Sequence, residues 1–169
     1  MRFRGVFAHF GAVSAYARRR GSGDPEAVAA EVMTVAWRRL ADVPTDDARP
    51  WLFATARNLL LAEWRERPRP AAGGRTAGDV AEPPSQPVSI DPEVASALRS
   101  LSVSDREALL LVAWEDLSPK LAAQALGIGE GAFRVRLHRA RRRFSDALAN
   151  AVPPDPRQPH PAALEMENR

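Results

Sequence analysis

The stretch that decides the fold is residues 118–144, SPKLAAQALGIGEGAFRVRLHRARRRF. Ser118 is a capping residue followed by a proline suited to the first helical position, which predicts a short helix from this point. Gly127 supplies the left-handed residue that ends this helix, and residues 129–131 lead into a second one. This helix–tight turn–helix spacing is typical of the helix-turn-helix motif, whose second helix enters the major groove of DNA.

The second predicted helix has one apolar stripe on an otherwise basic surface. At about 100° per residue, its apolar residues share one narrow face, which predicts the side buried in the core. These residues are Phe133, Leu137, Ala140, Phe144 and Leu148. Six arginines between positions 134 and 143 have no acid among them. Such a run is costly unless something neutralises it, and DNA phosphates would do so.

Part of this basic run also has an explanation without DNA. Positive charge is favoured near a helix C-terminus, and this alternative stays open for residues 141–143. For the helix as a whole, the turn spacing, the apolar stripe and the charge agree on DNA contact. Arg134, Arg136 and Arg139 lie early enough in the helix to approach base edges.

The composition excludes several classes of function. The chain of 169 residues has no cysteine, which excludes disulfides, thiol catalysis and thiolate metal sites. Its three histidines are far apart and its carboxylates are scattered, so we expect no metal, no cofactor and no enzymatic activity. All but one of its 24 basic residues are arginine, the exception being Lys120. This bias permits nucleic-acid binding but does not prove it.

The chain divides into two helix-like segments, residues 1–67 and 91–152. Between them, residues 68–90 are rich in Pro, Gly and Ala, which predicts a flexible linker, and the polar residues 153–169 predict a disordered tail. Strand signals are weak, so we expect an all-α protein of two small helical domains. Charged residues interrupt every apolar run well short of the roughly 18 residues of a membrane span, so we expect a cytoplasmic protein.

Helix starts are marked by capping residues. Asp24 and Asp91 each precede a proline, which predicts a helix from each position. Ser104 and Glu107 have the spacing of a capping box before an apolar run.

The first segment reads as two amphipathic helices around a polar loop at about residues 42–49. In the second of these helices, six residues recur at helical spacing, which predicts its buried face. They are Trp51, Leu52, Thr55, Ala56, Leu59 and Ala62. Basic, amide and aromatic groups follow nearby, and exposed aromatics beside arginine suit melted DNA. The apolar pattern favours core or semi-core positions for Trp37 and Trp51, whereas Trp64 fits such a position or a DNA-stacking one about equally well.

Three segments together resemble one family. AWRRL at 36–40, PWLFATARN at 50–58 and LSPKLAAQALGIGEGAFRVRLHRARRRF at 117–144 are similar to segments of the extracytoplasmic-function sigma factors, promoter-recognition subunits of bacterial RNA polymerase in the sigma-70 superfamily. The likeness covers about residues 5–67 and 94–148. The order and separation of the segments are more specific than any one of them.

The resemblance implies a sigma factor that directs core polymerase to promoters and performs no chemistry itself. It implies docking on the β′ clamp helices of the polymerase through Glu26, Glu31, Trp37, Arg38 and Arg39. The −10 element would be opened and read through Asp46, Asp47, Arg49, Arg57, Asn58, Trp64 and Arg65. The −35 element would be read through Lys120, Gly131, Arg134, Arg136, His138, Arg139, Arg142 and Arg143. The β flap of the polymerase and an anti-sigma factor are further implied partners.

The chain departs from the family pattern at several positions. Ala27 stands where the second residue of an acidic pair is usual, and Met33 replaces an aromatic. Leu121 replaces an acid, and residues 129–130 replace the Ser-Pro that opens the recognition helix. The alternative is therefore a stand-alone helix-turn-helix regulator that has lost polymerase docking. Such a regulator would bind a palindrome as a dimer, and no dimer seam is apparent.

Overall fold

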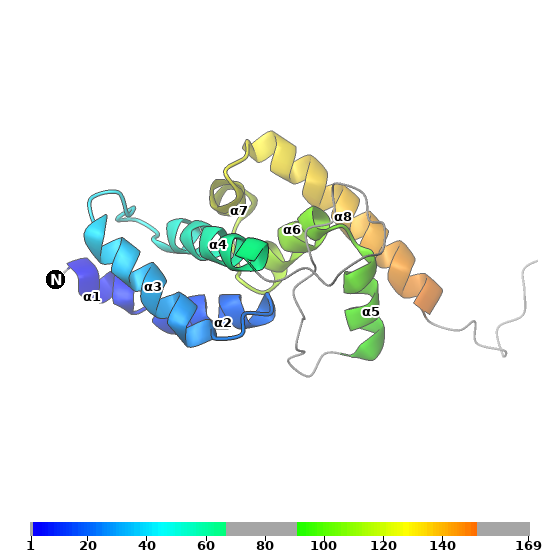
Figure 1. Ribbon diagram of the computed structural model, residues 1–169. Helices are drawn as coiled ribbons and strands as arrows, with labels where there is room; N and C mark the ends of the chain where they lie inside the picture. The colour runs from blue at the N-terminus through cyan, green and yellow to red at the C-terminus, as the bar shows by residue number, and fades with distance from the viewer. Residues whose placement is uncertain (1, 67–90, 152–169) are drawn as a thin grey trace, which may run out of the picture.

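The structure, a computed structural model, describes residues 2–66 and 91–151, which are helical with no strand among them (Figure 1). The first unit comprises α1 (Arg2–Phe7), α2 (Phe10–Arg19), α3 (Pro25–Arg38) and α4 (Arg49–Glu66). The second unit comprises α5 (Pro92–Ser100), α6 (Val103–Ala113), α7 (Pro119–Leu126) and α8 (Glu130–Ala151). The all-α prediction is confirmed. The predicted linker, 68–90, and the predicted tail, 153–169, lie outside the described residues.

Capping side chains start the helices as the sequence predicts. The Asp24 carboxylate accepts a hydrogen bond from the Ala27 N–H at 2.9 Å, and Asp91 accepts one from the Glu93 N–H at 2.8 Å. The Ser118 hydroxyl accepts one from the Leu121 N–H at 3.3 Å. Each cap satisfies a backbone donor that the first turn of the helix leaves free, and each precedes a proline. The three predicted starts are confirmed.

The predicted capping box at Ser104 is wrong by two residues. Helix α6 begins at Val103, and its N-cap is Ser102, whose hydroxyl accepts a hydrogen bond from the Asp105 N–H at 3.2 Å. Both serines have an acid three residues later, so the spacing alone could not separate them. The structure separates them because Glu107 pairs instead with Arg57 of the first unit, with 2.9 Å between Nε and Oε1.

Gly127 ends α7 in the left-handed conformation, with φ of 65°. Its N–H donates to the Gln124 carbonyl at 3.1 Å, and the Ile128 N–H donates to the Ala123 carbonyl at 3.0 Å, which is the Schellman pattern. No atom lies within 4 Å of the position that a Cβ at Gly127 would occupy. Any cost of a side chain here is therefore backbone strain.

We expect Gly127→Ala to lower the free energy of unfolding by about 1 kcal/mol, because an L-residue is disfavoured at positive φ. Chemical denaturation measures the change. Gly131→Ala, in the first turn of α8 and also with open space around its Cβ position, is the control and should be neutral or stabilising. Equal effects of the two substitutions would contradict the assigned strain.

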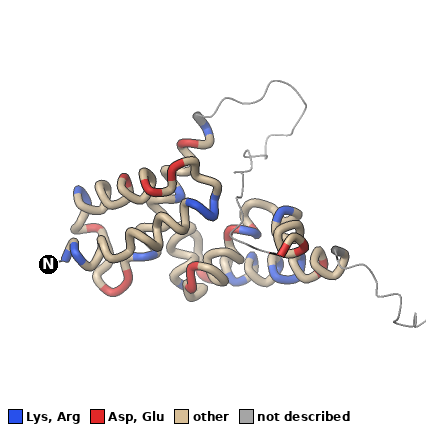
Figure 2. Tube along the Cα trace, turned by 90° about the horizontal axis from the view of Figure 1, so that it is seen from below, with Lys and Arg blue, Asp and Glu red and all other residues tan. Residues whose placement is uncertain are grey.

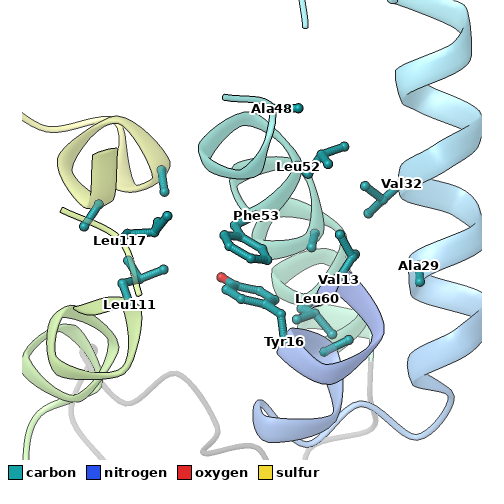
Figure 3. Packing of buried hydrophobic residues seen from close by; sticks show 14 of the residues in the cluster. Val13, Tyr16, Ala29, Val32, Ala48, Leu52, Phe53, Leu60, Leu111 and Leu117 are labelled. Carbon is teal, nitrogen blue, oxygen red and sulfur yellow. The ribbon is translucent and has the colours of Figure 1, made fainter. Parts of the chain in front are cut away.

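One hydrophobic core runs through both units. Tyr16 of α2 stacks on Phe53 of α4, with ring centroids 4.8 Å apart and planes at 12°. Figure 3 shows this pair facing Leu111 and Leu117 of the second unit, and all four side chains belong to one buried cluster. Burial raises the pKa of the Tyr16 hydroxyl well above its usual value. The described parts of the two units therefore pack together closely.

Helix α4 is buried on more than the one face that the sequence predicts. It packs against α2 and α3 of its own unit and against α7 of the other. Phe53 and Leu60 are fully buried although they lie outside the predicted stripe, and Ala62, which lies in it, is exposed. A helix covered from two sides has no single apolar stripe to find.

Candidate nucleic-acid interface

The inner face of α8 agrees with the predicted stripe. Phe133, Leu137 and Ala140 are buried, and Phe144 and Leu148 are half-buried. These contacts hold α8 against α5, α6 and α7. Its other faces are consequently open to solvent, and Figure 2 shows basic residues, all of them arginine, recurring along this helix.

The residues predicted to read the −35 element lie on this open surface. Arg136 is half-buried and the others are exposed. These others are Lys120, Gly131, Arg134, His138, Arg139, Arg142 and Arg143. Lys120 lies in the first turn of α7 and the rest lie along α8. The structure thus brings the whole predicted set onto two adjacent helices of the helix-turn-helix.

Two of these arginines already have acidic partners. Arg134 Nη2 lies 2.6 Å from Glu130 Oε1 one turn earlier, and Arg143 Nη1 lies 2.5 Å from Asp105 Oδ2 on α6. The Asp105 carboxylate is largely buried, and this pair links α8 to α6. The sequence showed the charge of Arg143 but gave no sign of this partner.

Arg136 and Arg139 differ from these two because they form no ion pair with another described residue. They line an open hollow of about 420 Å³ at the start of α8, beside Gly131 and Val135. Val135 is 51% exposed, which is unusual for a valine among arginines. Two forked donors around an aliphatic group suit the edges of base pairs, where acceptors and thymine methyl groups are presented.

The residues predicted at the −10 element divide into two groups. The first is the loop before α4, where Asp47 and Arg49 form a two-pronged ion pair. Arg49 Nη2 lies 2.8 Å from Asp47 Oδ2, and Arg49 Nε lies 3.1 Å from Oδ1. The Arg49 hydrogen bonds hold the pKa of the Asp47 carboxyl below its usual value. The Asp47 carboxylate therefore stays ionised within its pair with Arg49 at ordinary pH.

An open cavity of about 740 Å³ lies between this loop and α1. Arg2 and His9 line one side of it, and Asp46, Asp47 and Arg49 line the other. The Arg2 guanidinium also donates to the Val43 carbonyl at 2.5 Å, which ties α1 to the loop. The sequence missed Arg2 and His9 because their place here depends on how α1 packs. The mixture of donors and acceptors suits a polar planar group such as an unpaired base.

The second group lies along α4 and is not brought into this cavity. Asn58 and Arg65 are exposed, whereas Arg57 turns toward Glu107 of the second unit. Trp64 is half-buried and packs against the core. Its indole N–H is buried and has no partner among the described residues. Trp64 is thus less available for stacking than an exposed ring would be.

The prediction that Trp37 lies in the core is wrong. Trp37 is 63% exposed at the end of α3, and its ring lies edge-to-face with that of Phe3, with 4.9 Å between ring centroids. Phe3 in turn contacts Phe7, which is 51% exposed. Trp51, for which a core or semi-core position was favoured, is half-buried and packs against the core, as predicted. The four-residue spacing of Phe3 and Phe7 predicts that they share one side of a helix. Their position beside Trp37 depends on how that helix packs on α3, which the spacing does not show.

The other residues predicted to dock on polymerase lie on the same helix as Trp37 or just after it. Glu26, Glu31, Arg38 and Arg39 are all exposed on or just after α3. Arg39 pairs with Asp42, with 2.8 Å between Nε and Oδ2. Aromatic groups ringed by charged ones are the usual composition of a protein–protein interface. We call Phe3, Phe7 and Trp37 the aromatic face.

Among the residues that the structure describes, no helix is long and apolar enough to cross a membrane.

Comparisons with known proteins agree with this arrangement. Residues 92–144 match the family model for sigma-70 region 4. The chain is 33% identical over 118 residues to the ECF RNA polymerase sigma factor EcfG of Rhodopseudomonas palustris (strain TIE-1). The match covers 66% of this chain and 65% of that relative, so it spans just under two thirds of the relative's length.

Two solved structures share the fold. CnrH, in complex with the cytosolic domain of CnrY, is 29% identical with a TM-score of 0.62, over 88% of each chain. The sigma factor RpoE, in complex with the anti-sigma factor NepR from Bartonella quintana, is 20% identical with a TM-score of 0.60, over 86% of this chain and 95% of that one. The region 4 match and the relative from Rhodopseudomonas palustris show that this chain is similar to extracytoplasmic-function sigma factors of the sigma-70 superfamily over 66% of its length, and CnrH and RpoE show the shared fold.

Proposed function

We propose that this chain is a sigma factor that binds core RNA polymerase in the cytoplasm and directs it to promoters through their −10 and −35 elements. The observation that carries the proposal is the open basic surface of α8, within a segment that matches sigma-70 region 4. Nucleotide addition belongs to the polymerase, so the chain needs no catalytic group of its own. Its work is recognition and strand opening.

The −35 element is read by α8 in the major groove. Arg136 and Arg139 have their forked donors available for guanine, whose O6 and N7 accept two hydrogen bonds from one arginine. Val135 offers an aliphatic contact for a thymine methyl between them. Lys120, Arg142 and Arg143 contact phosphates, which position the helix but carry no sequence information. Affinity is therefore salt-dependent and specificity depends on few residues.

We expect Arg136→Ala to relax selectivity at one −35 position by about 1–3 kcal/mol, because a bidentate base contact is lost. Arg143→Ala should instead weaken binding to all sequences alike. Arg142→Ala is the matched comparison for Arg143→Ala, because Arg142 is also proposed to contact phosphate but forms no ion pair with another described residue, so it should show the same uniform loss without breaking the pair with Asp105. Selection of −35 variants by the polymerase holoenzyme measures the effect. Equal, sequence-independent losses from Arg136→Ala and Arg143→Ala would contradict these roles.

The −10 element is opened by trapping an unstacked base. The cavity beside the loop holds guanidinium, imidazole and carboxylate groups within one hollow. These groups can satisfy the pairing edge of a base that has left the duplex, and the binding energy offsets the cost of unstacking without ATP. Asn58 and Arg65, exposed on α4, contact the adjoining strand.

Core polymerase binds the first unit through the aromatic face and the charged residues around it, with the β′ clamp helices as the partner. Exposed Trp and Arg side chains are the residue types that dominate binding energy at such interfaces. The second unit contacts the β flap. By analogy with CnrH, which was solved with the cytosolic domain of CnrY, we expect a further protein partner, and the resemblance makes an anti-sigma factor the candidate.

A further inference from the structure

The ion pair between Asp105 and Arg143 lies at one side of the basic surface of α8. Asp105 Oδ2 is 2.5 Å from Arg143 Nη1, and the two side chains are 9% and 61% exposed. Both residues line the hollow beside α8 that Arg136 and Arg139 also line. A largely buried acid therefore holds one end of an arginine whose side chain is mostly open to solvent.

Asp105 belongs to a helix start that is fixed from two directions. Its N–H donates to the Ser102 hydroxyl at 3.2 Å, which caps α6. The next residue, Arg106, donates from Nε and Nη2 to three carbonyls at the end of α5, at 2.8 to 3.1 Å. Helices α5 and α6 both pack against α8 (Figure 1). The carboxylate is therefore held by packed helices, and a guanidinium that pairs with it loses most of its freedom.

Arg143 lies on the same side of α8 as Arg136 and Arg139. The three residues follow one another at helical intervals, which places them in one row along the helix. Arg136 and Arg143 are about two turns, or about 10 Å, apart along the axis. Phosphate contacts fix the register of a protein on the duplex. A phosphate contact made by Arg143 therefore decides which base pairs Arg136 and Arg139 face.

We propose that Asp105 is a positioning residue for recognition of the −35 element, because it fixes the Arg143 guanidinium for contact with one phosphate. The inference rests on the proposed function, in which Arg143 contacts phosphate while Arg136 and Arg139 read bases. A guanidinium has five N–H donors in a planar fork, so one nitrogen can bind the carboxylate while another binds phosphate. Asp105 acts through Arg143 and does not itself reach the DNA.

Fixing this arginine favours the specific complex over nonspecific ones. In nonspecific binding any phosphate will serve, so the charge of Arg143 matters and its position does not. In the specific complex one phosphate contact has to fit the base contacts, and an arginine that is mobile beforehand has to be ordered at a cost in affinity. Loss of the Asp105 charge also makes the surface more positive, but that strengthens binding to every sequence alike. The ratio of specific to nonspecific affinity therefore reports on position alone.

The test measures this ratio for the holoenzyme formed by core polymerase and the full chain. One duplex carries the −35 sequence that the wild-type holoenzyme selects from a randomised pool, and the second differs only in having those bases scrambled. Both affinities are measured at about 0.15 M salt, because protein–DNA affinity depends steeply on salt. Asp105→Asn keeps the shape of the side chain and removes its charge. We expect it to lower the ratio about fivefold, the cost of ordering one long side chain, and an unchanged ratio would overturn the inference.

Asp146→Asn is the matched control. Asp146 is exposed on α8 less than one turn after Arg143, and it forms no ion pair with another described residue. Its replacement changes the net charge by the same amount, so it separates the effect of the pair from the effect of charge. We expect Asp146→Asn to leave the ratio of affinities unchanged. An equal fall in Asp105→Asn and Asp146→Asn would overturn the inference, because it would trace the effect to charge.

Arg143→Lys tests the pair from its exposed partner, whose replacement does not threaten the fold. It keeps the charge, but a single ammonium lacks the planar fork that binds carboxylate and phosphate together. We expect the ratio to fall about as far as in Asp105→Asn, and no further when the two substitutions are combined, because each breaks the same pair. A wild-type ratio in Arg143→Lys, or additive falls in the double variant, would overturn the inference.

The selection step distinguishes this inference from the proposed function. If the wild-type holoenzyme selects no −35 sequence, the proposed function fails and the inference fails with it. If it selects one and Asp105→Asn discriminates as the wild type does, the inference alone is overturned.

Discussion

Replacing Phe53 with alanine is expected to lower the free energy of unfolding by about 3–5 kcal/mol, the loss typical of a buried aromatic. The ring is 2% exposed and stacks on Tyr16, with the second unit on its far side. Neither unit can collapse into the cavity without giving up contacts with the other. Guanidinium unfolding monitored by helical circular dichroism measures the effect.

Phe7→Ala is the matched control for Phe53→Ala. Its ring is 51% exposed, so its removal should cost well under 1 kcal/mol. A loss below about 1 kcal/mol for Phe53→Ala would show that this ring is not part of a shared core.

Replacing Trp37 with alanine is expected to weaken binding to core polymerase by about 2 kcal/mol, or roughly 30-fold, because exposed tryptophans are the commonest anchors of interfaces. The side chain is 63% exposed, so the free energy of unfolding should change little. Fluorescence anisotropy of the labelled chain, titrated with core polymerase, measures the affinity.

Trp37→Phe separates a ring contact from a general disturbance. A phenyl ring keeps the edge contact with Phe3 and should restore most of the affinity. Wild-type affinity in Trp37→Ala would place the docking surface elsewhere on the chain.

The sequence predicted those parts of the fold that depend on neighbours a few residues away. The caps at Asp24, Asp91 and Ser118 and the turn at Gly127 each involve hydrogen bonds within about five residues. The stripe of α8 could be found because that helix packs on one side only. The stripe also predicted which side of α8 stays open, so the residues predicted for the −35 element lie on that open surface, and their contact with DNA stays a prediction.

The errors arise where distant segments decide the outcome. Phe53 and Leu60 are buried because α4 is covered from two sides. Trp37 is exposed because Val32, Met33 and Ala36 already fill the inner face of α3. No local sequence pattern shows that Phe53 and Leu60 are buried or that Trp37 is exposed.

The candidate sites likewise include residues that are brought together from distant parts of the chain and that the sequence could not predict. The cavity beside the loop is lined by Arg2 of α1 and by His9, the residue before α2, some forty residues before Asp46 and Asp47 in the chain. Asp105 pairs with Arg143, which lies 38 residues later. Ion pairs at such separations have no signature in a single sequence. They require the packing of both units to be known.

The most direct test of the central claim is to mix the purified chain with bacterial core RNA polymerase and transcribe the DNA upstream of its own gene. We expect stoichiometric binding to core and a new, discrete transcription start site that neither component produces alone. A folded chain that fails to bind core, with no inhibitor protein present, would contradict the assignment. Specific binding of duplex DNA by that same chain would then indicate a stand-alone regulator, with Ala27→Asp as the first substitution to restore docking.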